Sequence, residues 1–247
     1  AVQDFLKANP ATVDVIGFHG QTVIHRPEIR LTVQLGDGSA LAKRLALPVV
    51  YDVRANDVAT GGQGAPFVPV YHRALAASVP ERPLVFVNIG GVSNVTWIGS
   101  QGHMIAFDTG PGNAPLDDWA LKHTGVARDE DGKLAATGTP KETIIDQFLN
   151  QAFFKLPPPK SLDRDSFAAL DLGALNAVDG AATLVEIIAR AIAGAANWVP
   201  EAPKAPVAFE EDKAQETAAI HRHSPYQLRA GPGTGKTRTL VERVKRS

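Results

Sequence analysis

Four loops that follow short apolar runs carry the residues of this sequence best suited to chemistry. A glycine pair, Gly90-Gly91, follows one run, and the backbone N–H groups of such glycines can approach phosphate oxygens without a Cβ in the way. Asp108 ends another run, a place where a partly buried carboxylate can serve as a general base. The other two loops hold mixed hydrogen-bond donors and acceptors of the kind a polyhydroxyl sugar requires, namely His19, Gln21, Arg54 and Asp57.

Each of these residues also has an ordinary structural interpretation. A glycine pair after a strand is usually a turn, and an aspartate at a strand end is more often a cap than a catalyst. His19 could be a structural histidine, while Arg54 and Asp57 could pair with each other at the surface. Taken one at a time, none of them specifies a function.

Alternating strands and helices must position these residues. Apolar runs predict strands at 13–18, 31–35, 48–51, 84–89, 94–98 and 104–107. Helical patterns occupy 114–123, 141–151 and 181–198, and residues 1–8 read as the tail of a helix. The sequence therefore predicts an α/β protein. We expect residues 13–107 to form one mixed sheet, in which strand ends bring His19, Asp52, Gly90 and Asp108 near one cleft.

Five segments taken together resemble the anhydro-N-acetylmuramic acid kinase family in order and spacing. They are GFHGQTVIHRP, YDVRANDVATGGQGAPFVP, VNIGGVSNVTWI, FDTGPGNAPLDDW and PPPKSLDRDSF. The resemblance covers residues 1–204, which we take as one partial kinase domain. It implies the two-lobed ASKHA fold of actin, Hsp70 and sugar kinases. The implied reaction opens the 1,6-anhydro ring of anhydro-N-acetylmuramic acid with water and phosphorylates O6, using ATP and Mg²⁺, during cell-wall recycling.

The resemblance also implies roles for individual residues. Asp108 matches the catalytic aspartate, which would take a proton from the attacking water. The sugar side would hold His19, Gln21, Arg54 and Asp57. The phosphate and ATP side would hold Gly90, Gly91, Asn94, Gly110, Gly112 and Asn113. The implied partner is a small amino sugar, and a homodimer is typical of the family.

Two family features have no counterpart in this sequence. The family opens with a phosphate loop of the type MSGTSLDG, and nothing before Ala1 supplies it. A glycine-rich adenosine loop, roughly VCGGG, follows in the family where this sequence reads PEAPKAP and then AFEEDKAQ. A distal glutamate that helps to hold the substrate is also lost. We therefore expect an incomplete kinase fold, truncated at both ends, that belongs to the family but has no measurable turnover.

A second motif lies beyond a proline-rich boundary at 200–206. Residues 230–237 read AGPGTGKT, a P-loop pattern that follows a short apolar stretch, 226–228, and precedes a helical run. Residues 209–247 resemble the start of superfamily 1 (UvrD/Rep-like) DNA helicases, with Gln215 in the place of their adenine-reading glutamine. We interpret 205–247 as a linker and a loosely docked appendage. Its phosphate-binding residues would be Gly233, Gly235, Lys236 and Thr237.

Composition sets further bounds on function. The formal net charge of −1 gives no general argument for nucleic acid or membrane as a partner, and no run is long enough to span a bilayer. The chain has no cysteine, which fits a cytoplasmic protein, and its histidines show no metal-ligand spacing. Two alternatives stay open: a helicase-type ATP-binding protein, with nucleic acid as its partner, and a carbohydrate-binding remnant without catalysis.

Overall fold

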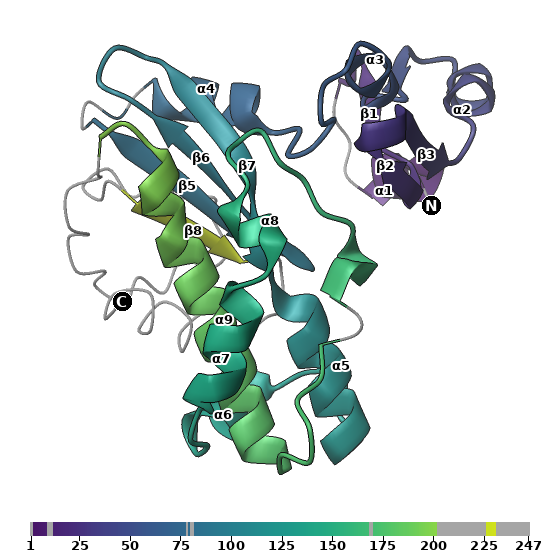
Figure 1. The fold of residues 1–247 in the computed structure, drawn as a ribbon. Helices are drawn as coiled ribbons and strands as arrows, with labels where there is room; N and C mark the ends of the chain where they lie inside the picture. The colour runs from purple at the N-terminus through teal and green to yellow at the C-terminus, as the bar shows by residue number, and fades with distance from the viewer. Residues whose placement is uncertain are drawn as a thin grey trace. The chain divides into compact units, whose positions relative to one another are not determined.

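The computed structural model describes residues 2–8, 12–77, 79, 82–167, 170–201 and 226–230. The chain divides into two compact units, residues 1–64 and 65–247, a division that the sequence did not predict (Figure 1). The mixed α/β class is confirmed. In the part of the chain that the structure describes, no helix is both long and apolar enough to cross a membrane.

The first unit contains two small sheets. Strands β1 and β4 pair in parallel, with Ile16 opposite Val49, while β2 and β3 form an antiparallel hairpin. The hairpin turns through Arg30, whose φ of 57° lies in the left-handed region. The elements in chain order are α1 (Val2–Ala8), β1 (Ile16–Phe18), β2 (Gln21–Arg26), η1 (Pro27–Ile29), β3 (Leu31–Leu35), α2 (Gly38–Leu45), β4 (Val49–Tyr51) and α3 (Ala55–Ala59).

The second unit is built on a four-stranded sheet in the order β7-β6-β5-β8. Strands β5, β6 and β7 form an antiparallel meander, and β8 pairs in parallel with β5. The strand β5 is buried along almost its whole length, as expected for a central strand covered on both faces. The strands are β5 (Leu84–Ile89), β6 (Val92–Ile98), β7 (Met104–Pro111) and β8 (Tyr226–Ala230).

Helices cover both faces of the described sheet. The long helix α9 packs its apolar side chains, such as Leu184 and Ile188, against alternate strand residues that include Val87 and Phe107 (Figure 1). Phe86 points to the opposite face, where it meets α4. The helical segments are α4 (Pro69–Ala76), α5 (Asn113–Thr124), η2 (Glu130–Gly132), α6 (Lys133–Ala136), α7 (Glu142–Leu149), α8 (Ala152–Lys155), η3 (Arg164–Phe167), α9 (Ala177–Ala193) and η4 (Gly194–Trp198).

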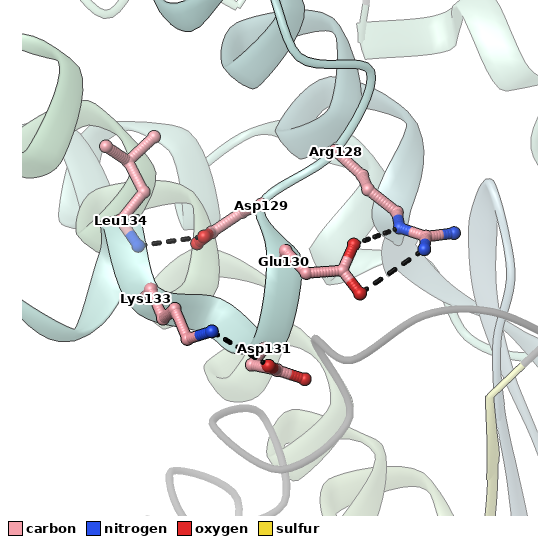
Figure 2. A network of polar contacts seen from close by, with 6 residues as sticks. All are labelled: Arg128, Asp129, Glu130, Asp131, Lys133 and Leu134. Carbon is pink, nitrogen blue, oxygen red and sulfur yellow. Dashed lines mark hydrogen bonds and ion pairs between the residues drawn. The ribbon is translucent and has the colours of Figure 1, made fainter.

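A buried aspartate caps the short helix α6, which packs against α9. The carboxylate of Asp129 accepts hydrogen bonds from the N–H groups of Leu134 (2.8 Å) and Ala135 (3.0 Å), two donors that have no partner within the helix (Figure 2). Ion pairs around it, such as Arg128 with Glu130, are exposed and contribute little. The buried Asp129 therefore supplies most of the polar stabilisation at this turn.

The expectation of one mixed sheet over residues 13–107 is wrong, because the described strands fall into three sheets. Apolar runs indicate that a strand exists, but its partner is chosen by contacts distant in sequence. In the first unit, three-residue strands pair with each other and the hairpin is closed by its local turn. The strand β2 was also missed, since no strand was predicted between residues 18 and 31.

The C-terminal segment is described only at residues 226–230. The short apolar stretch at 226–228 lies within the strand β8, which pairs in parallel with β5 and places Tyr226 opposite Val85. These five residues extend the sheet beyond β5, and the interpretation of 205–247 as a linker and a loosely docked appendage stays a prediction. The P-loop residues Gly233, Gly235, Lys236 and Thr237, together with Gln215, lie outside the described residues.

Candidate active site

Asp108 is buried at the edge of the sheet and is held through both its backbone and its side chain. It lies on β7, opposite Asn94 of β6, with only 4% of its surface exposed. Its N–H donates to the carbonyl of Lys160 at 3.0 Å, and its Oδ2 accepts from the N–H of Leu162 at 2.8 Å. The segment 160–162 thus covers the outer edge of β7 and fixes the orientation of the carboxylate.

A bulge in β7 directly follows Asp108. Ser93 pairs with Gly110 while Asn94 pairs with Asp108, so Thr109 is an extra residue on the β7 side. The hydroxyl of Thr109 donates to the carbonyl of Ser93 at 3.2 Å, which anchors the bulge. Bulges redirect the side chains around them and are common beside active sites. After the bulge, Gly110 faces α9, where an added Cβ would lie 2.9 Å from that of Ala191.

The two glycine loops predicted to bind phosphate are bonded to each other. The N–H of Gly112 donates to the carbonyl of Gly91 at 3.0 Å, and the N–H of Asn113 donates to that of Gly90 at 2.6 Å. A side chain at Gly112 would meet the Gly90 oxygen at 2.2 Å, so this approach requires glycine. The helix α5 begins at Asn113, and its positive N-terminal end therefore lies at the joined loops.

Buried polar atoms without partners occur on β6 and at the start of α5. Within the described residues, Ser93 Oγ, Asn94 Oδ1 and Asn113 Oδ1 are buried and make no hydrogen bond. The amide of Asn113 is fixed, because its Nδ2 donates to the carbonyl of Ile89 at 2.9 Å. An unsatisfied buried polar atom costs about 1–3 kcal/mol, which a bound polar ligand would recover. The unsatisfied Asn94 Oδ1, on the residue paired with Asp108, and the unsatisfied Ser93 Oγ and Asn113 Oδ1 are therefore groups that a ligand could satisfy.

The first unit contains the four residues predicted for the sugar side, and three of them share a network. Arg54 donates from Nε to Nε2 of His19 at 3.0 Å, and His19 Nδ1 lies 2.8 Å from the carbonyl of Gly20. Because Nε2 accepts a hydrogen bond, the proton of the neutral ring belongs on Nδ1. This geometry orders the guanidinium and the imidazole as a pair.

Asp57 joins this network through Gly64. The carboxylate Oδ2 of Asp57 accepts from the N–H of Gly64 at 2.6 Å, while Arg54 donates to the Gly64 carbonyl. Gln21 stands apart at the start of β2, where its Nε2 donates to the carbonyl of Thr22 at 3.4 Å. The structure therefore groups His19, Arg54 and Asp57 through these hydrogen bonds and leaves Gln21 outside the network.

Comparison with known proteins gives this arrangement a family. A protein-family model described as anhydro-N-acetylmuramic acid kinase matches residues 1–205. The chain belongs to the anhydro-N-acetylmuramic acid kinase family. This match ends before the P-loop pattern at 230–237, so the helicase resemblance stays a prediction.

Relatives named anhydro-N-acetylmuramic acid kinase align with most of the chain. The protein of Nitrobacter winogradskyi is 56% identical over 208 residues, which are 83% of this chain and 57% of the relative. That of Bradyrhizobium diazoefficiens is 55% identical over 208 residues, with the same coverage of 83% and 57%. The protein of Paramagnetospirillum magneticum is 54% identical over 209 residues, 82% of this chain and 59% of the relative. The chain thus spans less than two thirds of the length of these curated relatives.

Sequence reasoning assigned no role to three residues that lie next to Asp108 or the joined loops in the structure. Leu162 acts through a backbone N–H, which no side-chain pattern reveals. Ser93 stands within the segment VNIGGVSNV, where its hydroxyl next to the glycine pair was a usable signal. Lys160 stands in PPPKSLDRDSF, where nothing in the residue pattern signals that this lysine is buried.

Proposed function

We propose that this protein serves the reaction named for its family, in which 1,6-anhydro-N-acetylmuramic acid is hydrolysed and phosphorylated by ATP to N-acetylmuramic acid 6-phosphate. The observation that carries the proposal is the joining of the Gly90-Gly91 and Gly112-Asn113 loops beside a buried, doubly held Asp108. Such a site places a base next to a phosphate cradle, as hydrolysis coupled to phosphoryl transfer requires. The ASKHA architecture and a role in cell-wall recycling belong to the same proposal.

Asp108 is the proposed general base. It takes a proton from a water molecule whose oxygen attacks the anomeric carbon C1, and the C1–O6 bond breaks. O6 then attacks the γ-phosphorus of ATP, the bond to the bridging oxygen breaks, and ADP leaves. The N–H of Leu162 keeps Oδ2 in place and so sets the direction in which the carboxylate faces the water. Burial of Asp108 keeps competing solvent away from this proton transfer.

The chemistry of the joined loops fits a nucleoside triphosphate. Phosphate oxygens would accept from the Ser93 hydroxyl and from N–H groups in the first turn of α5, while the glycine pair leaves room for their approach. The amide oxygens of Asn94 and Asn113 are oxygen ligands of the type that Mg²⁺ prefers, and they could equally accept hydrogen bonds from water molecules bound to Mg²⁺. When bound, Mg-ATP supplies the phosphoryl group and neutralises charge on it.

The network of the first unit is the proposed sugar side. Arg54 presents a charged planar donor fork that His19 holds in place, Asp57 supplies a carboxylate acceptor, and Gln21 adds an amide. An N-acetylated amino sugar with a lactyl carboxylate offers matching hydroxyls, an amide and a negative charge. We assign the carboxylate to Arg54, since guanidinium groups bind carboxylates in two-point geometry.

The test is formation of N-acetylmuramic acid 6-phosphate from the anhydrosugar and Mg-ATP, followed by mass spectrometry. Asp108→Asn is expected to lower the rate by about 10²–10⁴-fold or more, because it removes the base. Asp146→Asn is the matched control, since Asp146 is exposed on α7. Equal rates in the wild type and Asp108→Asn would refute the assignment.

The absence of measurable turnover, which the sequence analysis expects for an incomplete kinase fold, stays a prediction. The same assay measures it. If the wild-type chain forms no detectable product, binding of the anhydrosugar becomes the readout for the site. Saturable sugar binding without product would support the carbohydrate-binding alternative, whereas the absence of both would refute the proposed function.

A further inference from the structure

Lys160 is a buried cation that the proposed reaction does not use. Only 6% of its surface is exposed, and its Nζ donates to the carbonyl of Phe153 at 3.1 Å. In the part of the chain that the structure describes, no carboxylate pairs with it. Burying a charge without a counter-ion is expensive, so the site must offer some other compensation.

Three aromatic rings provide that compensation. Nζ lies 4.5 Å from the ring centre of Phe153, 5.4 Å from that of Trp198 and 5.8 Å from that of Phe107. Ring faces attract cations, most strongly when water is excluded. Burial lowers the pKa of Lys160, which agrees with an ammonium held by rings and a carbonyl rather than by a carboxylate. The side chain is thus fixed at its far end.

The backbone of the same residue holds Asp108. The Lys160 carbonyl accepts the Asp108 N–H at 3.0 Å, and two residues later the Leu162 N–H donates to Asp108 Oδ2 at 2.8 Å. Phe107, one of the three rings, is the residue directly before Asp108 on β7. Lys160 therefore ties the covering segment to the strand at the position of the proposed base.

We propose that Lys160 is a positioning residue, whose ammonium, anchored on Phe107, Phe153 and Trp198, holds the segment 160–162 in the geometry that orients the Asp108 carboxylate. This inference rests on the proposed function only for its catalytic consequence. The structural claim, that the ammonium controls the two hydrogen bonds to Asp108, stands on the contacts alone.

The experiment compares Lys160→Met, which keeps the length of the side chain and removes its charge, with Lys160→Arg, which keeps a cation over the rings. The control is Lys155→Met, at the exposed end of α8. Amide hydrogen exchange and the side-chain carboxyl resonance of Asp108 are followed by NMR. In Lys160→Met, we expect exchange at Asp108 and Leu162 to accelerate by about tenfold or more while Val95 is unaffected.

Titration of the Asp108 carboxyl group distinguishes a role of Lys160 in positioning Asp108 from a general effect of Lys160 on stability. A carboxylate that loses an N–H donor is protonated more easily, so the Asp108 midpoint should move to higher pH in Lys160→Met and return in Lys160→Arg. Unchanged exchange and an unchanged midpoint in Lys160→Met would overturn the inference, even if the protein were less stable. Should Lys160→Met fail to fold, Trp198→Leu replaces it, because this variant removes one of the three rings. Faster exchange at Asp108 and Leu162 and a higher Asp108 midpoint, both by smaller amounts, would then support the inference, and no change in either would overturn it.

Turnover distinguishes this inference from the proposed function. If the wild type forms the 6-phosphate, Lys160→Met should lower kcat about tenfold or more with little change in KM for the sugar. A normal kcat in Lys160→Met, alongside an inactive Asp108→Asn, would overturn positioning and leave the function intact. Altered exchange and titration in a protein that neither binds nor converts the sugar would instead support positioning and refute the function.

Discussion

The N–H of Asn113 donates to the carbonyl of Gly90 at 2.6 Å and so joins the first turn of α5 to the glycine loop after β5. These two residues are separated in sequence by the whole of β6 and β7. Their bond places a helix N-terminus and a glycine pair at one point, beside Asp108. A single substitution at the adjacent Gly112 tests how much this junction matters.

Gly112→Ala should damage the junction. Its Cβ would lie 2.2 Å from the Gly90 carbonyl oxygen, a backbone atom that cannot move without displacing the loop. We expect a loss of about 1–3 kcal/mol in the free energy of unfolding, together with weaker ATP binding. The matched control is Gly194→Ala, because Gly194 has φ of −60° and open space where a Cβ would go. Chemical denaturation and ATP titration measure both effects, and equal behaviour of the two variants would contradict this account.

Asp129→Ala should destabilise the second unit without affecting ligand binding. It leaves the N–H groups of Leu134 and Ala135 without their buried acceptor, at a cost of about 1–3 kcal/mol. Glu130→Ala is the control, since Glu130 is exposed and its loss should leave the unfolding midpoint nearly unchanged. Denaturant unfolding compares the two variants. An equal midpoint for Asp129→Ala and the wild type would show that solvent replaces the cap.

Arg54→Lys should weaken binding of the anhydrosugar by about tenfold or more while leaving ATP binding unchanged. A lysine keeps the charge but cannot reproduce the donor fork that binds His19 and Gly64 together. Arg44→Lys, on the exposed last turn of α2, is the control for the same exchange elsewhere in the first unit. Calorimetric titration with sugar and with ATP gives both constants. A sugar affinity that Arg54→Lys does not change would remove Arg54 from the sugar side.

The stability contributed by Lys160 should rise with pH in the alkaline range. Burial lowers the pKa of Lys160 in the folded protein below its ordinary 10.5, so the unfolded chain binds this proton more tightly. Stability therefore increases as pH rises from the lowered folded pKa towards 10.5. The free energy of unfolding of the wild type should increase relative to that of Lys160→Met across this interval, whereas Lys155→Met should follow the wild type. If the free energies of unfolding of the wild type and Lys160→Met differed by the same amount at every pH in this interval, the expected pH dependence would be contradicted.

Much of the fold could be predicted from local patterns. The strands 31–35 and 84–89 were predicted with their observed bounds. The helix predicted at 181–198 is observed as α9, which ends at Ala193, followed by the 3-10 helix η4 up to Trp198. What could not be predicted was pairing, because the choice between one sheet and three depends on contacts distant in sequence. The four-residue helix α6 was missed for a different reason, since it is stabilised by Asp129 from outside the helix.

The candidate site was predictable where it depends on residue type. Gly90, Asp108 and Asn113 were identified from motifs, and the structure brings their loops together. Backbone contributions were not predictable: the carbonyl of Lys160 and the N–H of Leu162 can come from any residue that follows the same path. The buried position of Lys160 was equally hidden, because its aromatic contacts come from three separate segments.

The most direct test of the central claim, that the Asp108 site takes the anhydrosugar, is an NMR titration of the chain with 1,6-anhydro-N-acetylmuramic acid. The account predicts saturable shifts of the amide resonances of Asp108 and Leu162, with the same binding constant at both. Asp108→Asn should still bind the sugar, because the base acts on water rather than on the ring itself. Resonances of these residues that do not respond to saturating sugar, or that respond only in proportion to its concentration, would contradict the claim.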